Sequence, residues 1–163
     1  MNVEAIARTE SRTAGLSLAG EAGAAGYVVL IGRVLFSAIF LMASLGHFSQ
    51  QTIGYAAHQG VPMAGLLVPA SGVLSLVGGL SILTGYRAKF GAWMLVVFLV
   101  PVTITMHNFW AVKDPMMAQM HQAMFMKNLS MLGGALLISY FGAGPMSLDA
   151  WGAARSGGAA ARR

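Results

Sequence analysis

Cysteine is absent from this chain of 163 residues. Its absence excludes disulfides, thiolate metal sites, iron–sulfur clusters and thiol–disulfide exchange by the chain itself. Carboxylates are also scarce, and none lies within a long apolar run. A proton relay of carboxylates through a membrane and carboxylate-based hydrolysis are therefore poorly supported. The acidic residues are Glu4, Glu10, Glu21, Asp114 and Asp149.

Charge of either sign is rare. Charged residues make up 9% of the chain and hydrophobic residues 56%, whereas soluble domains carry about 25% charged residues. This balance predicts an integral membrane protein surrounded by a lipid bilayer. The net charge of +5 is spread over tails and loops with few aromatic residues beside it, so we expect no nucleic-acid partner. Phosphate-binding and nucleophile motifs are missing as well.

Four apolar runs predict an all-α fold, a polytopic membrane four-helix bundle. Each run approaches the roughly 20 residues that cross a bilayer. Residues 1–26 are expected to form a flexible cytoplasmic tail, and residues 146–163 a basic cytoplasmic tail. A cleaved signal peptide is the alternative for the N-terminus, but the first apolar run is longer than a signal h-region. The bundle should occupy residues 27–145, with spans at about 27–48, 64–83, 90–106 and 125–141.

Two patterns predict how the spans pack. Ser71, Ser75 and Gly79 recur at i, i+4 and i+8, and small residues at this spacing let helices approach closely in lipid. We assign this face to a helix contact; the same pattern leaves a homo-oligomer open. The first and third spans end similarly, at Leu45–Phe48 and Met106–Phe109, and the second and fourth each carry a Gly-Gly pair. These similarities indicate a possible parallel repeat of two helices.

The cationic residues predict the orientation. Lys113 and Lys127 lie on one side of the expected bundle, and the others, apart from Arg33, lie on the opposite side. The positive-inside rule then places both termini in the cytoplasm. All four histidines fall at or beyond the outer face in this topology. The cations on the cytoplasmic side are Arg8, Arg12, Arg87, Lys89, Arg155, Arg162 and Arg163.

Arg33 lies inside the first span. Three interpretations stay open: a side chain that extends to the interface, a structural ion pair, and a functional buried cation. We expect its guanidinium to reach the cytoplasmic interface and to meet Asp149 or carbonyls near the end of the fourth span. An exposed ion pair between Arg33 and Asp149 would contribute about 0–1 kcal/mol.

Polar side chains gather where the first and third spans end and the fourth begins. Imidazole, amide and ammonium groups can donate to a carbonyl, which suits a quinone ring or a lipid headgroup. Interfacial anchoring and helix capping explain the same groups without a ligand. We expect these residues to line one concavity at the outer face. The predicted ligand-binding residues are His47, His107, Asn108, Lys127 and Asn128.

Met116–Met124 is the methionine-rich part of the loop before the fourth span. We expect a short helix that roofs the concavity. Met117, His121 and Met124 share one face of such a helix, and thioether and imidazole ligands suit copper(I). A helix lying on the membrane, with methionine as apolar filler, explains the same spacing. No catalytic residue is assigned.

In order and spacing, several short motifs resemble the DoxX family of small four-span bacterial membrane proteins. The match covers roughly residues 27–151. It rests on Arg33, Gly46, Gly60-Val61-Pro62, Gly78-Gly79, Gly85, His107-Asn108-Phe109-Trp110, Lys127-Asn128-Leu129, Gly133-Gly134 and Gly142-Ala143-Gly144.

The resemblance implies a helical bundle in the bacterial cytoplasmic membrane, related to subunits of quinone-linked oxidases and to partners of oxidoreductases. The leading hypothesis is an accessory membrane subunit that binds quinone or lipid and docks to a membrane oxidoreductase, without catalysis of its own. The first alternative is a carrier for a small neutral solute, which requires a polar cavity at mid-membrane. The second is a purely structural membrane protein without a ligand.

Overall fold

The computed structural model describes the backbone of residues 3–160 and the side chains of residues 23–156. This part of the chain is all-α, without strands, which confirms the predicted fold class. The elements are α1 (Val3–Gly46), α2 (Gln50–His58), α3 (Ala64–Thr84), α4 (Ala88–Met106), η1 (Phe109–Ala111), α5 (Pro115–Phe141) and α6 (Leu148–Ala160).

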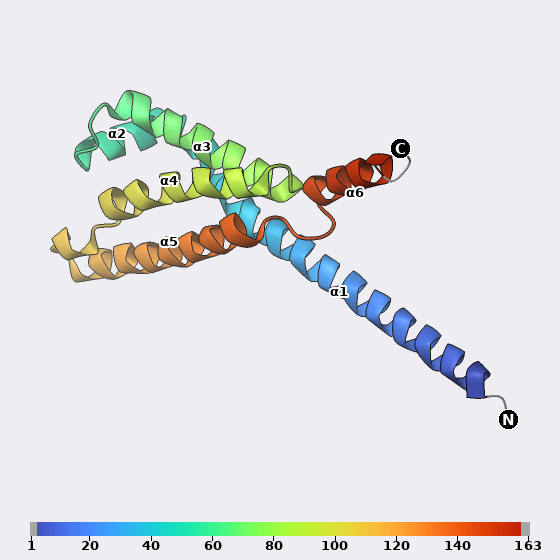
Figure 1. Ribbon diagram of the computed structural model, residues 1–163. Coiled ribbons are helices and arrows are strands. Elements are labelled where there is room, and N and C mark those ends of the chain that lie inside the picture. The colour runs from blue at the N-terminus through green and yellow to red at the C-terminus, as the bar shows by residue number, and fades with distance from the viewer. Residues whose placement is uncertain (1–2, 161–163) are drawn as a thin grey trace.

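The long helices pack in the order α1, α3, α4, α5, so that α3 and α4 are the central pair (Figure 1). Helix α2 packs on α3, and η1 packs on α5. Figure 1 shows α1 and α4 ending together at the end of the bundle that carries α2 and η1, which we call the α2 end. The turn between α3 and α4, the end of α5, and α6 form the opposite, α6 end.

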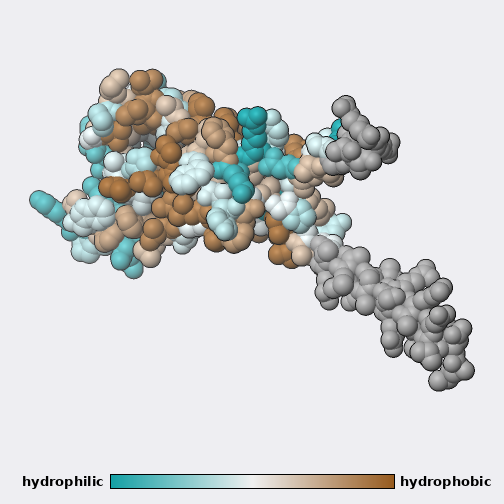
Figure 2. Space-filling model, in the orientation of Figure 1, coloured by the Kyte–Doolittle hydropathy of each residue, from teal (hydrophilic) through white to brown (hydrophobic). Residues whose placement is uncertain are grey.

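Within the described residues, four helical segments are long and apolar enough to cross a membrane. Hydrophilic side chains gather mainly at the two ends of the bundle in Figure 2, with apolar side chains between them. A bilayer around the middle of the bundle accounts for this distribution, since polar groups are costly in hydrocarbon. The four segments are Gly23–Gly46, Ala64–Thr84, Ala88–Ala111 and Pro115–Phe141.

The fourth helix begins much earlier than the sequence analysis predicted, at Pro115 instead of near residue 125. Asp114 is its N-cap, and the Asp114 carboxylate accepts a hydrogen bond of 2.8 Å from the Met117 backbone N–H. Proline suits the first turn, where its missing N–H has no helical partner. The methionine-rich segment is therefore part of α5, and the predicted separate loop helix does not exist.

The expected tails also contain helix. Helix α1 begins at Val3, and α6 runs from Leu148 to Ala160. Low apolar content argues against a buried core, but alanine, glutamate and arginine are strong helix formers. A membrane-spanning helix can therefore extend beyond the apolar run from which its start was predicted.

The predicted small-residue face of α3 does contact another helix. The Ser75 hydroxyl donates 3.0 Å to the Phe40 carbonyl of α1. A Cβ placed on Gly79 would lie 3.0 Å from a methyl of Leu41 and 3.3 Å from the Phe40 Cβ. Close approach of α1 and α3 thus depends on these small residues, as expected from their spacing. Phe40 continues into the core with Leu95 of α4.

Candidate functional site

None of the three pockets described in this structure is lined by both His47 and the other predicted ligand-binding residues. His47 follows α1 and lies on the wall of a pocket formed with α2, α3 and α4. His107 follows α4 at the same end of the bundle, but its ring lies beside His121 of α5, with 5.9 Å between the ring centroids. The reason is the helix order, which puts α1 on α3 and α5 on α4. His47 and His107 lie at the same end of the bundle, but the pocket that His47 lines does not include His107.

The other members of that predicted set have separate environments. Asn128 is buried in α5 on the same stripe as His121 and Ala135, each seven residues apart. Lys127 is exposed, and Asn108 is half-buried at the start of η1, where its carbonyl accepts from a backbone N–H. Their role in binding stays a prediction.

His121 is nine-tenths buried, and its Nδ1 has no hydrogen-bond partner in the described structure. Met117 and Met124, its predicted copper co-ligands, remain exposed. Among the described residues, no group of three or more histidine, cysteine, aspartate or glutamate side chains could hold a metal ion. Because that observation does not count methionine sulfur, the mixed methionine–histidine site stays a prediction.

The pocket at the α2 end, which we call the His47 pocket, has a volume of about 380 Å³. Such a volume and a mostly apolar wall are typical of small-ligand sites. Polar groups come from His47, Thr52, Ser71 and Thr105. Helix α2 closes one side because Ala56 and Val68 pack together there. The remaining wall is apolar and includes Val61, Pro62, Leu67, Ala70, Leu74, Val97, Phe98, Pro101, Val102 and Met106.

The His47 ring is oriented by its own helix. Its Nδ1 lies 2.9 Å from the Ala43 carbonyl. Because a carbonyl only accepts, Nδ1 carries the proton in this hydrogen bond, and in the neutral form of the ring Nε2 is then an acceptor. The ring also packs edge-on against Phe98 of α4, with 5.6 Å between centroids.

The three hydroxyl groups of the pocket already use their protons. Ser71 and Thr105 donate to carbonyls of their own helices at 2.7 Å and 2.8 Å. Thr52 lies 2.8 Å from the Ser49 hydroxyl, which itself donates to the end of α1, so Thr52 is the donor of that pair. The hydroxyl oxygens keep free lone pairs. All four polar groups can therefore accept hydrogen bonds from a ligand.

Pro101 lies on the same wall and leaves a backbone carbonyl of α4 without its helical donor. Proline has no N–H, so the carbonyl four residues earlier, at Val97, lacks its helical donor. Pro101 and Val97 both line the pocket. The sequence analysis did not identify Pro101, Ser71 or Thr105 as pocket residues. Val97, Pro101 and Thr105 follow one another at intervals of four residues, which places them on one face of a helix. This spacing could have identified them from the sequence.

Arg33 holds the opposite end of the bundle together. Its side chain is buried, and it donates 3.0 Å to the Ala143 carbonyl and 2.7 Å to the Met146 carbonyl in the loop after α5. This confirms the expected contact with carbonyls near the end of the fourth span. The guanidinium is buried at this junction and not exposed at the interface.

The predicted ion pair between Arg33 and Asp149 is replaced by another arrangement. The Asp149 carboxylate accepts from the backbone N–H of Arg87 at 2.8 Å and of Ala88 at 3.2 Å. Asp149 thereby caps α4, where negative charge is favourable near the free N–H groups of a helix start. Its own N–H donates 2.9 Å to the Gly85 carbonyl.

A model of the SURF4 family matches residues 1–152, nearly the whole chain. The chain belongs to the SURF4 family. Inner membrane protein YqjF of Escherichia coli (strain K12) is 32% identical over 127 residues, which cover 74% of this chain and 88% of that protein.

Two yeast proteins are also similar to this SURF4-family chain. ER-derived vesicles protein ERV29 of Saccharomyces cerevisiae is 35% identical over 77 residues, 47% of this chain and 24% of that protein. Surfeit locus protein 4 homolog of Schizosaccharomyces pombe is 29% identical over 145 residues, 88% of this chain and 44% of that protein. The chain thus spans less than half of each yeast relative. No solved structure matches it.

The family assignment corrects the resemblance drawn from the sequence. The match to the SURF4 model and to these relatives overturns the DoxX assignment. The predicted role as a quinone- or lipid-binding subunit of an oxidoreductase rested on that resemblance, and it is wrong. Glycine pairs and polar helix ends recur in many membrane bundles, so their order did not separate one four-span family from another. The comparisons support neither the small-solute carrier nor the purely structural alternative.

Proposed function

We propose that this SURF4-family protein is a membrane receptor that binds an apolar segment of a polypeptide in the His47 pocket. The observation that carries the proposal is that the pocket combines apolar walls with polar groups that can accept, but not donate, hydrogen bonds to a ligand. A backbone N–H or a terminal amine supplies the complementary donors, and aliphatic side chains fill the remaining volume.

Filling the pocket should abolish peptide binding. Ala70 lines the pocket and is exposed, so Ala70→Trp can occupy the cavity without disturbing the buried core. We expect the affinity for a fluorescent Leu-Val-Leu amide with a free amine to fall at least about tenfold, or 1.4 kcal/mol. Fluorescence anisotropy with detergent-solubilised protein measures this change.

Ala57→Trp is the matched control, because Ala57 is exposed on α2 but does not line the pocket. It should bind the peptide as the unsubstituted protein does. A second probe with methylated backbone nitrogens should bind about tenfold more weakly, since it loses donors but keeps its side chains. Equal binding of both peptides would contradict the role of the acceptors, and equal binding by both tryptophan variants would exclude the pocket.

We also propose that the protein lies in a bacterial inner membrane with both termini in the cytoplasm. The E. coli relative is named an inner membrane protein, and most cations outside the spans lie with the termini or in the turn between α3 and α4. This distribution favours the cytoplasm for the α6 end.

The absence of cysteine allows a direct test of orientation. Lys113→Cys, between α4 and α5, should react with a membrane-impermeant maleimide in intact E. coli cells. Arg155→Cys, on α6, should react only after the membrane is permeabilised. Both positions are exposed, so the unequal labelling reports the side of the membrane. The reverse labelling pattern would invert the topology.

A further inference from the structure

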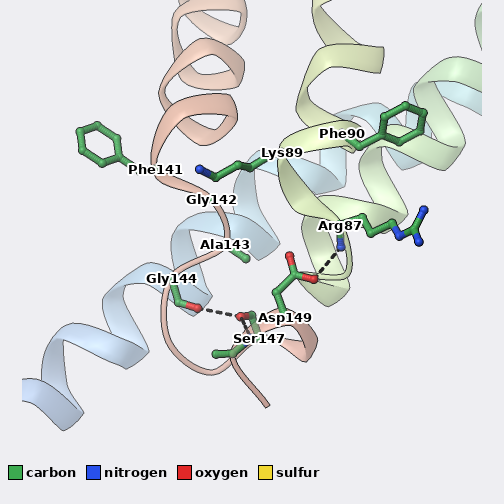
Figure 3. Close-up of a pocket in the computed structure, with 10 residues that line it drawn as sticks. Arg87, Lys89, Phe90, Phe141, Gly142, Ala143, Gly144, Ser147 and Asp149 are labelled. Atoms are coloured by element: carbon green, nitrogen blue, oxygen red, sulfur yellow. Dashed lines mark hydrogen bonds between the residues drawn. The ribbon is translucent and has the colours of Figure 1, made fainter. Parts of the chain in front are cut away.

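A second groove lies at the α6 end, between the start of α4 and the loop after α5 (Figure 3). Its volume is about 550 Å³. Arg87, Lys89 and Phe90 line one side, and Phe141 to Gly144 line the other. Because both sides are ends of candidate membrane-spanning helices, we place the groove at the level of lipid headgroups. The proposed peptide site is at the other end of the bundle.

Lys89 supplies the charge that this groove can offer. Figure 3 shows its side chain extending from α4 toward Gly142. A Cβ on Gly142 would lie 3.3 Å from the Lys89 Cε, so the glycine leaves room for the lysine stem. The Asp149 carboxylate also lines the groove and accepts from the backbone N–H groups of Arg87 and Ala88. Among the described residues, the Lys89 ammonium donates to no acceptor. The ammonium remains available to an anion.

Backbone N–H groups on the facing wall are available too. The N–H groups of Ala143 and Gly144 donate to no acceptor within the described residues, although Ala143 is buried. Because backbone N–H groups generally form hydrogen bonds, these two donors are free to bind an acceptor from outside the chain. Successive backbone N–H groups in a turn can form an anion-binding concavity, and the loop that contains these two groups is irregular, with positive φ at Gly142 and Gly144.

The other polar groups of the groove are already engaged. The Ser147 hydroxyl donates to the Gly144 carbonyl at 2.7 Å and accepts from a backbone N–H at 3.1 Å. The Arg87 guanidinium lies over the Tyr86 ring and points away from Lys89 in Figure 3. The anion would therefore meet the Lys89 ammonium and the two backbone N–H groups.

We propose that this groove binds the phosphate of an anionic phospholipid. Lys89 pairs with the phosphate charge, and the Ala143 and Gly144 N–H groups donate to its oxygens. Phe90 and Phe141 are 66% and 72% exposed on the two sides, where acyl chains would pass. Basic pockets between the ends of spans bind lipid headgroups in this way. The flanking apolar surface favours a lipid over free phosphate, which offers nothing to contact it.

Native mass spectrometry of the full-length protein, titrated with phosphatidylglycerol, tests the proposal. Lys89→Gln should weaken binding about tenfold, and Lys89→Arg should retain it. Lys113→Gln, an exposed lysine at the α2 end, is the matched control and should bind as the unsubstituted protein does. Phosphatidylcholine has no net charge and should bind weakly to the unsubstituted protein. Its affinity should be similar to that of phosphatidylglycerol for Lys89→Gln.

Three outcomes would overturn this site. Equal weakening by Lys89→Gln and Lys113→Gln would show that only the total charge attracts the lipid. Unchanged lipid binding by Lys89→Gln would exclude Lys89 from the site, provided that a thermal unfolding transition shows that the variant is folded. Glycerol phosphate that binds as tightly as the lipid would identify a soluble phosphate as the occupant. None of these outcomes bears on peptide binding at the His47 pocket.

Discussion

Gly85→Ala should destabilise the protein by about 2–5 kcal/mol. Gly85 lies in the turn between α3 and α4 with φ +67°, where an L-residue costs about 1–2 kcal/mol. A methyl group there would also collide with the Arg33 guanidinium and the Ser147 side chain. Overpacking of this kind costs about 1–3 kcal/mol more, and it would disturb the hydrogen bonds from Arg33 to the loop after α5.

Gly60→Ala separates the two contributions. Gly60 has φ +83°, but no atom lies within 4 Å of a Cβ placed there. This control should cost only about 1–2 kcal/mol. In detergent, the thermal transition of Gly85→Ala should therefore lie at least about 2 °C below that of Gly60→Ala. Equal transition temperatures would mean that the Arg33 junction tolerates the methyl group and does not limit stability.

Arg33 shows how far sequence reasoning reached in this protein. A cation inside an apolar span must find partners because lipid supplies none, so contact with carbonyls at the end of the fourth span could be predicted. Its assignment to Asp149 could not be tested by sequence, since Asp149 had an equally good use as the cap of α4. The sequence alone does not show whether Arg33 donates to the Asp149 carboxylate or to backbone carbonyls at the same level of the bundle.

The His47 pocket marks a second limit. Hydropathy gave the depth of His47 and His107, and these residues follow α1 and α4, which end at the same end of the bundle. Their separation depends on which helices are neighbours, and the apolar runs carry little information on that point. Ser71 and Thr105 were overlooked for the same reason, because their importance comes from α3 and α4 meeting at one cavity.

The start of the fourth helix was a different kind of error. Asp114 followed by Pro115 is a local helix-start signal that needs no knowledge of the fold. The sequence analysis followed the apolar run instead and placed Lys127 and Asn128 at the beginning of the span. The structure resolves the conflict by burying Asn128 and exposing Lys127 on one continuous helix.

Gly78→Leu should have the most severe effect on folding. At the crossing of the central pair, a Cβ on Gly78 would lie 2.7 Å from a Leu95 methyl and 2.9 Å from the Gly91 carbonyl. The Gly91 carbonyl belongs to the helix backbone and cannot move aside without shifting α4. Membrane helices that meet through small residues lose their van der Waals contact when they are forced apart. We expect little monodisperse protein after extraction in detergent.

Gly133→Leu provides the matched comparison. Gly133 is also a helical glycine, on α5, but a Cβ there would meet nothing within 4 Å. Both substitutions remove a glycine from a helix and gain about 1 kcal/mol of helix propensity, so propensity cancels between them. Gly133→Leu should elute as the unsubstituted protein does and unfold at an equal or higher temperature. Normal elution of Gly78→Leu would show that α3 and α4 can separate without loss of the fold, and the glycine contact would then not hold the central pair together.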